Sequence, residues 1–192
     1  MNSVSLDGYS AGPDQSEEHP LGIGGLQLHG WHIGDVDPAN QPVVDELSDN
    51  VGAVIMGRNM FGPVRGEWDR EWNGWWGEDP PYHVPVFVLT HYPRASVEMQ
   101  GGTTFHFVTD GIESALEQAR AAAGDQDVLI GGGASTVRQY LRAGLVDRFT
   151  LNVAPVVLGG GERPLDGLEP GSFKLERVID APEATHLTYS AR

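Results

Sequence analysis

The chain has no cysteine and a single lysine, Lys174, among its 192 residues. Without cysteine it can form no disulfide, no thiolate metal site and no cysteine nucleophile. Its 12 basic side chains are outnumbered by 27 acidic ones, for a formal net charge of −15. Nucleic acids and anionic membranes are bound by surfaces rich in lysine and arginine, so neither is an expected partner. A phosphate group would have to be held locally, by backbone N–H groups and a few arginines.

Long apolar runs are missing as well. No run approaches the roughly 18 residues of a membrane-spanning helix, and no basic leader precedes an apolar core. We therefore expect a cytoplasmic protein. Hydrophobic residues make up 40% of the chain and charged residues 20%, which is typical of a soluble globular protein. Because no repeat, linker or composition break divides the sequence, we predict one domain over residues 1–192.

The clearest motif lies between Asp127 and Leu141. Residues 128–130 predict a short buried strand, which stops at three glycines, and a helical pattern begins immediately afterwards. Glycines allow a tight turn and leave no Cβ between the backbone and a ligand. The helix directs its free N–H groups and its positive dipole end at that turn. The pattern is that of a phosphate site, although an empty strand-to-helix turn would look the same.

Two other predicted buried strands end in a comparable way. Residues 51–56 stop at Gly57-Arg58, and residues 86–89 stop at Thr90-His91. Ligands of open α/β sheets bind beyond the carboxyl ends of the strands, so three such ends suggest a dinucleotide. Arginine and hydroxyl groups gather here without an acidic residue, which favours NADPH over NADH. Arg94 is either a further phosphate contact or an exposed turn residue.

The predicted cofactor-binding residues therefore come from these three strand ends. They are Gly57, Arg58, Asn59, Met60, Thr90, His91, Arg94, Gly131, Gly132, Gly133, Ala134, Ser135 and Thr136.

Four of the five tryptophans fall within nine residues, at Trp68, Trp72, Trp75 and Trp76. Such a cluster either packs a long loop against the core or forms a subunit contact. Alternatively, it forms an aromatic wall for a flat ligand ring. We favour packing, since aromatic clusters more often pack than recognise ligands.

Residues 10–40 are rich in glycine, proline and aspartate, and we interpret them as a long surface loop. His29 and His32 lie three residues apart within it. No third ligand is evident and the segment has no helical pattern, so we expect no metal site.

Strands alternate with helices up to about residue 145, and the remainder is rich in strands. The pattern predicts an α/β fold whose mostly parallel sheet carries antiparallel C-terminal edge strands. Residues 53–61, Leu89-Thr90-His91 and residues 130–133 resemble the cofactor-binding segments of dihydrofolate reductases. Ser5-Leu6-Asp7-Gly8 and residues 154–161 are more similar to the reductase domain of riboflavin-biosynthesis deaminase-reductases.

The resemblance implies a dihydrofolate-reductase-like three-layer α/β/α sandwich, NADPH as cofactor and a homodimer. The sequence departs from dihydrofolate reductases in one respect: none of Asp45, Glu46 and Asp49 aligns with the acidic residue that faces their pterin. The tryptophan-rich insert matches neither group of enzymes.

The function expected from these observations is hydride transfer from NADPH to a small heterocyclic or ribosylamino-pyrimidine-like substrate. The alternatives are a dihydrofolate reductase and a non-catalytic NADPH-binding module. Asp7, at the end of a short strand expected over residues 4–6, is the candidate catalytic residue, either anchoring the substrate or relaying a proton. We favour the alternative, that Asp7-Gly8 simply makes a turn in which the carboxylate binds nearby N–H groups.

Overall fold

The computed structural model describes residues 1–190. These residues form two compact units. One comprises Met1–Leu47 and residues 137–190, and the other comprises Ser48–Thr136. Whether the chain is a single domain stays a prediction. Among the described residues, no helix is both long enough and apolar enough to span a bilayer.

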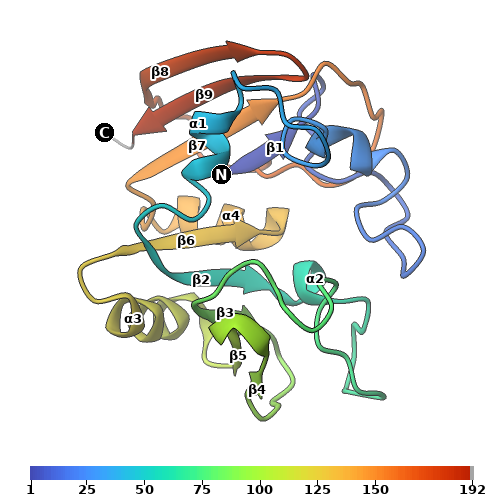
Figure 1. The fold of residues 1–192 in the computed structure, drawn as a ribbon, viewed down its shortest axis with the longest axis vertical. Helices are drawn as coiled ribbons and strands as arrows, with labels where there is room; N and C mark the ends of the chain where they lie inside the picture. Colours follow the sequence, from blue (N-terminus) through green and yellow to red (C-terminus); the bar gives the residue numbers. More distant parts are fainter. Residues whose placement is uncertain (191–192) are drawn as a thin grey trace. The chain divides into compact units, whose positions relative to one another are not determined.

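The unit formed by Ser48–Thr136 is built on a five-stranded sheet of order β4-β5-β3-β2-β6. The strands β2 (Val51–Gly57), β3 (Pro85–Leu89), β5 (Thr104–Val108) and β6 (Asp127–Gly132) run parallel. The short strand β4 (Val97–Glu98) pairs antiparallel with β5 and is followed by the 3₁₀ turn η2 (Gln100–Gly102) (Figure 1). All three strands predicted from the sequence are therefore present and lie side by side; β2 and β3 are buried as predicted, whereas residues 128–130 of β6 are only half-buried.

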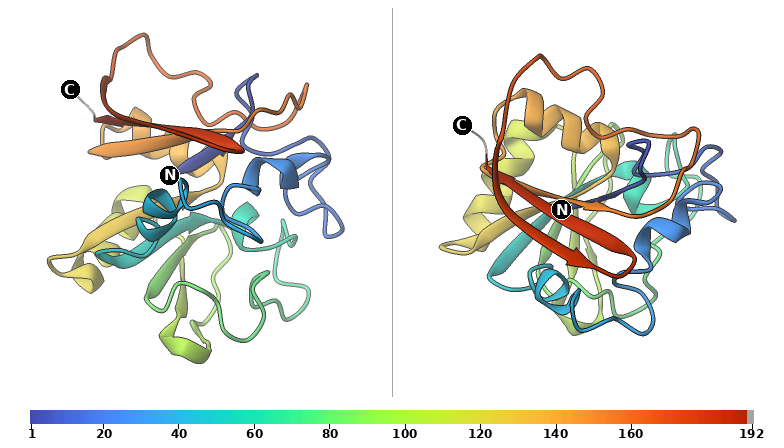
Figure 2. Two further views of the ribbon diagram at one scale, coloured as in Figure 1. Left: turned by 45° about the horizontal axis from the view of Figure 1, so that its top comes forward. Right: turned by 90° about the horizontal axis from the view of Figure 1, so that it is seen from above.

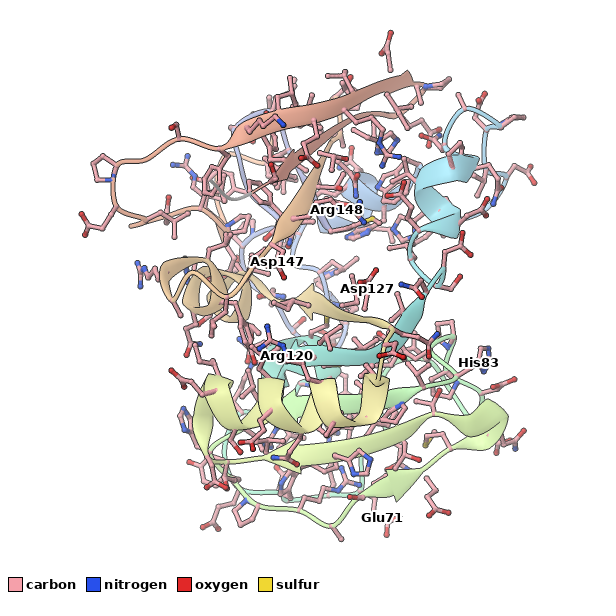
Figure 3. The ribbon with its side chains drawn as sticks, turned by 90° about the vertical axis from the view of Figure 1, so that its left-hand side faces the viewer. Glu71, His83, Arg120, Asp127, Asp147 and Arg148 are labelled. Atoms are coloured by element: carbon pink, nitrogen blue, oxygen red, sulfur yellow. The ribbon has the colours of Figure 1, made fainter. Side chains whose placement is uncertain are left out.

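The core of this unit gathers apolar side chains from the central strands. One cluster of fully buried side chains in it consists of Val54, Met56, Phe61, Val86, Val88 and Phe105. Trp68, Trp72 and Trp76 pack against them, so the tryptophan-rich segment does pack a long loop. Helix α3 (Gly111–Ala123) buries an alanine-rich face and contacts β2 and β3. Figure 3 shows α3, which carries the labelled Arg120, lying across these strands.

The other unit contains a four-stranded sheet of order β1-β7-β9-β8. The strand β1 (Asn2–Val4) is parallel to β7 (Arg148–Val153), and β9 (Ala184–Ser190) is antiparallel to both β7 and β8 (Lys174–Ala181). The predicted C-terminal antiparallel hairpin is present as β8–β9, in red in Figure 2. The prediction that it lies at the edge of the parallel sheet is wrong: β9 pairs with β7 instead, so the hairpin belongs to this separate four-stranded sheet.

Two further details of this unit differ from the sequence prediction. The first strand covers Asn2–Val4 rather than residues 4–6, because Ser5–Gly8 closes as a turn in which the Gly8 amide donates to the Ser5 carbonyl at 2.9 Å. Residues 10–40 are not wholly a surface loop. They include the 3₁₀ helix η1 (Gly25–His29), and both Leu28 and Trp31 are buried in the core. The helix α1 (Gln41–Asp45) follows.

Candidate cofactor site

The carboxyl ends of the three predicted strands meet at one edge of the five-stranded sheet. Gly57, at the end of β2, pairs in register with Leu89 of β3, and Met56 pairs with Gly132 of β6. A Cβ built on Gly57 would lie 2.3 Å from Oγ1 of Thr136. Glycine at position 57 is therefore what allows the end of β2 and the turn after β6 to approach so closely.

The glycine turn after β6 leads directly into α4 (Ala134–Arg142). Gly132 has φ +135°, a conformation that side chains rarely adopt, and the Gly132–Gly133 peptide bond is cis. A Cβ on Gly133 would meet no atom within 4 Å, so open space lies beside this backbone. The helix α4 has nine residues and starts at Ala134, directly after this turn. The free N–H groups of its first turn therefore point toward the glycines. The arrangement suits an anionic group.

Arg58 opens the short helix α2 (Arg58–Phe61) and is only 9% exposed. Nη1 donates a hydrogen bond to Oγ1 of Thr90 at 2.7 Å, and Nη2 donates to the carbonyl of Gly66 at 3.0 Å. Nε is buried without a hydrogen-bond partner. A buried donor without an acceptor is unfavourable, so this atom is a candidate contact for a ligand oxygen.

Arg94 and Trp68 complete this cluster. The Arg94 guanidinium lies 4.7 Å from the Trp68 ring centroid, and that of Arg58 lies 3.3 Å from the same centroid. Nη1 of Arg94 donates to the carbonyl of Trp72, and Nη2 donates to Oδ1 of Asn73 at 2.9 Å. Burial lowers the pKa of both arginines, and for Arg58 the neighbouring Arg94 charge lowers it further.

The structure thus brings the residues from β2, β3 and β6 to one place. Thr90, Ala134 and Thr136 are buried, and Asn59, His91 and Ser135 are exposed. The side chain of Met60 lies against the turn, since a Cβ on Gly132 would be 3.3 Å from its sulfur. The cofactor-binding role of all these residues stays a prediction.

Sequence reasoning did not include Trp68 or Gly66 among the site residues. Both residues lie in the irregular segment after α2. No hydrophobic periodicity or glycine motif in that segment predicts which of its residues will contact Arg58 at the strand end. The clustering of tryptophans was visible, but it pointed to packing in general rather than to Arg58.

Asp7 belongs to the other unit, where its carboxylate ties the Ser5–Gly8 turn to the distant residues 158 and 159. Oδ1 accepts hydrogen bonds from Oγ of Ser5 at 2.6 Å and from the Leu158 amide at 3.1 Å, and Oδ2 accepts one from the Gly159 amide at 2.7 Å. The Ser5 hydroxyl, followed by these amides, lowers the pKa of Asp7 to about 2. The carboxylate is therefore ionised at neutral pH and acts as an acceptor.

Asp7 also lines a cavity of about 210 Å³. The other lining residues are Val4, Gly8, Leu151, Arg163, Pro164, Leu165 and Asp166. The guanidinium of Arg163 lies 4.3 Å from the ring centroid of Tyr9, and its Nε is buried without a hydrogen-bond partner. The cavity can hold one small ring, with an acceptor at Asp7 and a cation at Arg163.

His29 and His32 bind one another, with Nδ1 of His29 2.9 Å from Nε2 of His32. Among residues 1–190, no group of three or more potential ligand side chains is arranged to hold a metal ion.

Comparison with known proteins identifies the family. The family model described as the RibD C-terminal domain matches residues 1–187. The chain belongs to this family. The predicted resemblance to riboflavin-type reductases is therefore confirmed, and family membership supports a reductase of the riboflavin-pathway type.

The solved structures agree on the fold. A protein of Shewanella sp. PV-4 that is named for riboflavin biosynthesis has a TM-score of 0.63 and 25% identity, over 98% of this chain and 95% of that one. The deaminase/5-amino-6-(5-phosphoribosylamino)uracil reductase of Thermotoga maritima has a TM-score of 0.56 and 13% identity. The chain covers 54% of that enzyme and is itself covered to 98%. The predicted dihydrofolate-reductase-like α/β fold with a mainly parallel sheet is confirmed.

Among curated proteins, the uncharacterized protein YyaP of Bacillus subtilis (strain 168) is 24% identical over 164 residues. The match covers 83% of this chain and 75% of YyaP.

Proposed function

We propose that this chain is an NADPH-dependent reductase that acts on a small heterocyclic substrate of the ribosylamino-pyrimidine type. The observation that carries the proposal is the buried, unpartnered Nε of Arg58 at the junction of three parallel strand ends. Such a junction is where α/β sheets bind nucleotides, and arginine is the side chain that best matches a phosphate.

The residues present fit this cofactor. The amides at the start of α4 would hold the pyrophosphate, with Gly133 leaving room for its approach. Arg58, Thr90 and Arg94 would hold the ribose 2′-phosphate through charge-assisted hydrogen bonds. When bound, NADPH supplies a hydride to an electrophilic carbon of the substrate.

Asp7 would anchor the substrate. Its Oδ1 already accepts two hydrogen bonds, whereas Oδ2 accepts one from Gly159 and keeps a lone pair for a substrate N–H. Its lowered pKa favours this role over that of a proton relay, because a carboxylate ionised at neutral pH has no proton to give. The small cavity around Asp7 suits one ring rather than an extended ligand.

The substrate class follows the activity in the name of the Thermotoga maritima relative, which we extend to this chain as part of the proposal. A homodimer and a cytoplasmic location stay predictions.

The decisive experiment measures oxidation of NADPH by absorbance, with 5-amino-6-(5-phosphoribosylamino)uracil or dihydrofolate as the acceptor. Turnover with the aminouracil and none with dihydrofolate is the expected result. Turnover only with dihydrofolate would assign the chain to the folate enzymes. Stoichiometric NADPH binding without turnover of either acceptor would indicate a binding module, and no NADPH binding would overturn the proposal.

A further inference from the structure

The segment between α2 and β3 contributes one side chain to the cluster at the strand ends. The indole of Trp68 lies against two guanidinium groups, with Cζ of Arg58 3.3 Å and Cζ of Arg94 4.7 Å from its ring centroid. The face of an aromatic ring carries negative electrostatic potential and attracts cations within about 6 Å. Trp68 is therefore positioned to bind both arginines at once.

The indole is itself held in place by the rest of this unit. Its Nε1 donates a hydrogen bond to the carbonyl of Tyr92 at 3.2 Å. Its ring packs edge-on against Phe61 and Phe107, with centroid separations of 6.1 and 5.2 Å. A ring fixed on three sides is a rigid platform, so the arginines that stack on it lose little further freedom when they bind a ligand.

The two arginines need such a platform because they repel one another. The hydrogen bonds that each donates go to neutral oxygens: Thr90 Oγ1 and the Gly66 carbonyl for Arg58, and the Trp72 carbonyl and Asn73 Oδ1 for Arg94. Neutral acceptors offset only part of the repulsion between neighbouring cations. The carboxylates of Asp69, near Arg58, and Glu71, near Arg94, offset a further part of it. In a chain of net charge −15, the two neighbouring guanidinium groups still form a local site for a dianion.

We propose that Trp68 is a positioning residue that sets the preference for NADPH over NADH, by holding Arg58 and Arg94 together as a clamp for the 2′-phosphate. This inference rests on the proposed function. It concerns only the 2′-phosphate, because NADH carries a hydroxyl at that position and gains little from two aligned guanidinium groups. Loss of the indole face should therefore weaken NADPH binding and leave NADH binding nearly unchanged.

The test compares Trp68→Leu with Trp68→Tyr and with a control, Trp75→Leu. Leucine keeps apolar contact with Phe61 and Phe107 but has no π face, whereas tyrosine keeps one. Trp75 belongs to the same segment and its ring packs on Trp72, at a centroid separation of 4.7 Å. Calorimetry would give the dissociation constants of NADPH and NADH, and of 2′-AMP and adenosine, for each variant.

In Trp68→Leu the dissociation constant of NADH divided by that of NADPH should fall roughly tenfold. The dissociation constant of adenosine divided by that of 2′-AMP should fall by a similar factor. Trp68→Tyr should restore most of the preference, and Trp75→Leu should match the wild type. A partly unfolded variant would lose affinity for NADPH and NADH equally. The ratio of the two dissociation constants therefore distinguishes a positioning role of Trp68 from an effect on folding.

Three results would overturn the inference. An unchanged ratio in Trp68→Leu, or equal weakening of both nucleotides, would leave Trp68 a packing residue. Tighter NADPH binding would mean that the indole covers Arg58 and obstructs the phosphate. Wild-type protein that binds neither nucleotide would instead overturn the proposed function, and this inference with it.

Discussion

Nη1 of Arg58 donates a hydrogen bond of 2.7 Å to Oγ1 of Thr90, although the two residues lie 32 positions apart in the chain. They follow the ends of β2 and β3, where Gly57 pairs with Leu89. The Thr90 hydroxyl also accepts a hydrogen bond from the Tyr92 amide at 3.1 Å. One buried hydroxyl therefore fixes both the arginine and the turn that carries Tyr92.

Replacing Thr90 with valine should destabilise the fold. Valine keeps the shape of threonine but offers no acceptor, so Nη1 of Arg58 and the Tyr92 amide lose their partner in a buried site. We expect the free energy of unfolding to fall by about 1–3 kcal/mol, measured by urea denaturation. Thr109→Val, which removes an exposed hydroxyl, should change it by less than about 0.5 kcal/mol. Equal effects of the two substitutions would show that the Thr90 contact is unimportant.

Replacing Arg58 with alanine should weaken the preference for NADPH over NADH. A guanidinium paired with a phosphate contributes a charge-assisted contact that NADH cannot use. The dissociation constant of NADPH should rise by about tenfold or more, while that of NADH changes little. Arg120→Ala, on α3, is the control. Equal losses for the two nucleotides would place Arg58 away from the 2′-phosphate.

The strand ends could be predicted from sequence because each signal is local. A short apolar run that stops at glycine gives a strand and a turn, and the parallel α/β pattern then brings the carboxyl ends of β2, β3 and β6 together. Burial of Arg58 under Trp68 had no such signal. It depends on the path of an irregular segment, which is set by tertiary packing rather than by hydrophobic period.

Residues 10–40 illustrate the same limit. Glycine, proline and aspartate correctly indicated a segment without long helices or strands. They gave no indication that Leu28 and Trp31 are buried, or that Nε1 of Trp31 donates a hydrogen bond to Oγ of Ser3 at 2.9 Å. A loop that contributes core side chains has the composition of a surface loop, so composition alone cannot distinguish them.

Two glycine substitutions should separate packing from ligand binding. In Gly57→Ala the new methyl group would meet Oγ1 of the buried Thr136 at 2.3 Å, so the free energy of unfolding should fall by about 1–3 kcal/mol. Gly133→Ala meets no atom within 4 Å and should unfold as the wild type does. Its methyl group would nevertheless enter the space offered to the pyrophosphate, so calorimetry should show weaker NADPH binding. Unchanged binding would place the phosphates elsewhere.

Asp7→Asn should leave NADPH binding intact and lower turnover, because the amide cannot replace an ionised acceptor for a substrate N–H. The free energy of unfolding should also depend on the charge of this carboxylate. Its pKa is about 2 in the folded chain against an ordinary 3.8, so its stabilisation is present above about pH 4 and is lost as the pH falls toward 2. The difference in unfolding free energy between wild type and variant should shrink over that interval. Unchanged turnover would remove Asp7 from the mechanism.

His29 should make the protein sensitive to mild acid. Burial, with a contribution from His32, lowers the pKa of His29 from 6.5 to about 4, and its Nε2 is buried without a hydrogen-bond partner. The unfolded chain therefore binds this proton at a higher pH than the folded chain does, and acid favours unfolding. Between about pH 7 and pH 5 this group should reduce the free energy of unfolding by about 2 kcal/mol.

His29→Phe removes the titrating group but keeps an aromatic ring, so urea unfolding of this variant should show a smaller loss between those two pH values. His19→Gln removes an exposed histidine of the same segment and should retain the wild-type loss. Burial is the larger cause of the lowered pKa of His29, so His32→Gln should retain most of the acid sensitivity that His29 confers. Burial lowers the pKa of His32 as well, so this variant should lose the separate contribution of His32. If His29→Phe were as acid-sensitive as the wild type, the proton would be taken up at another site.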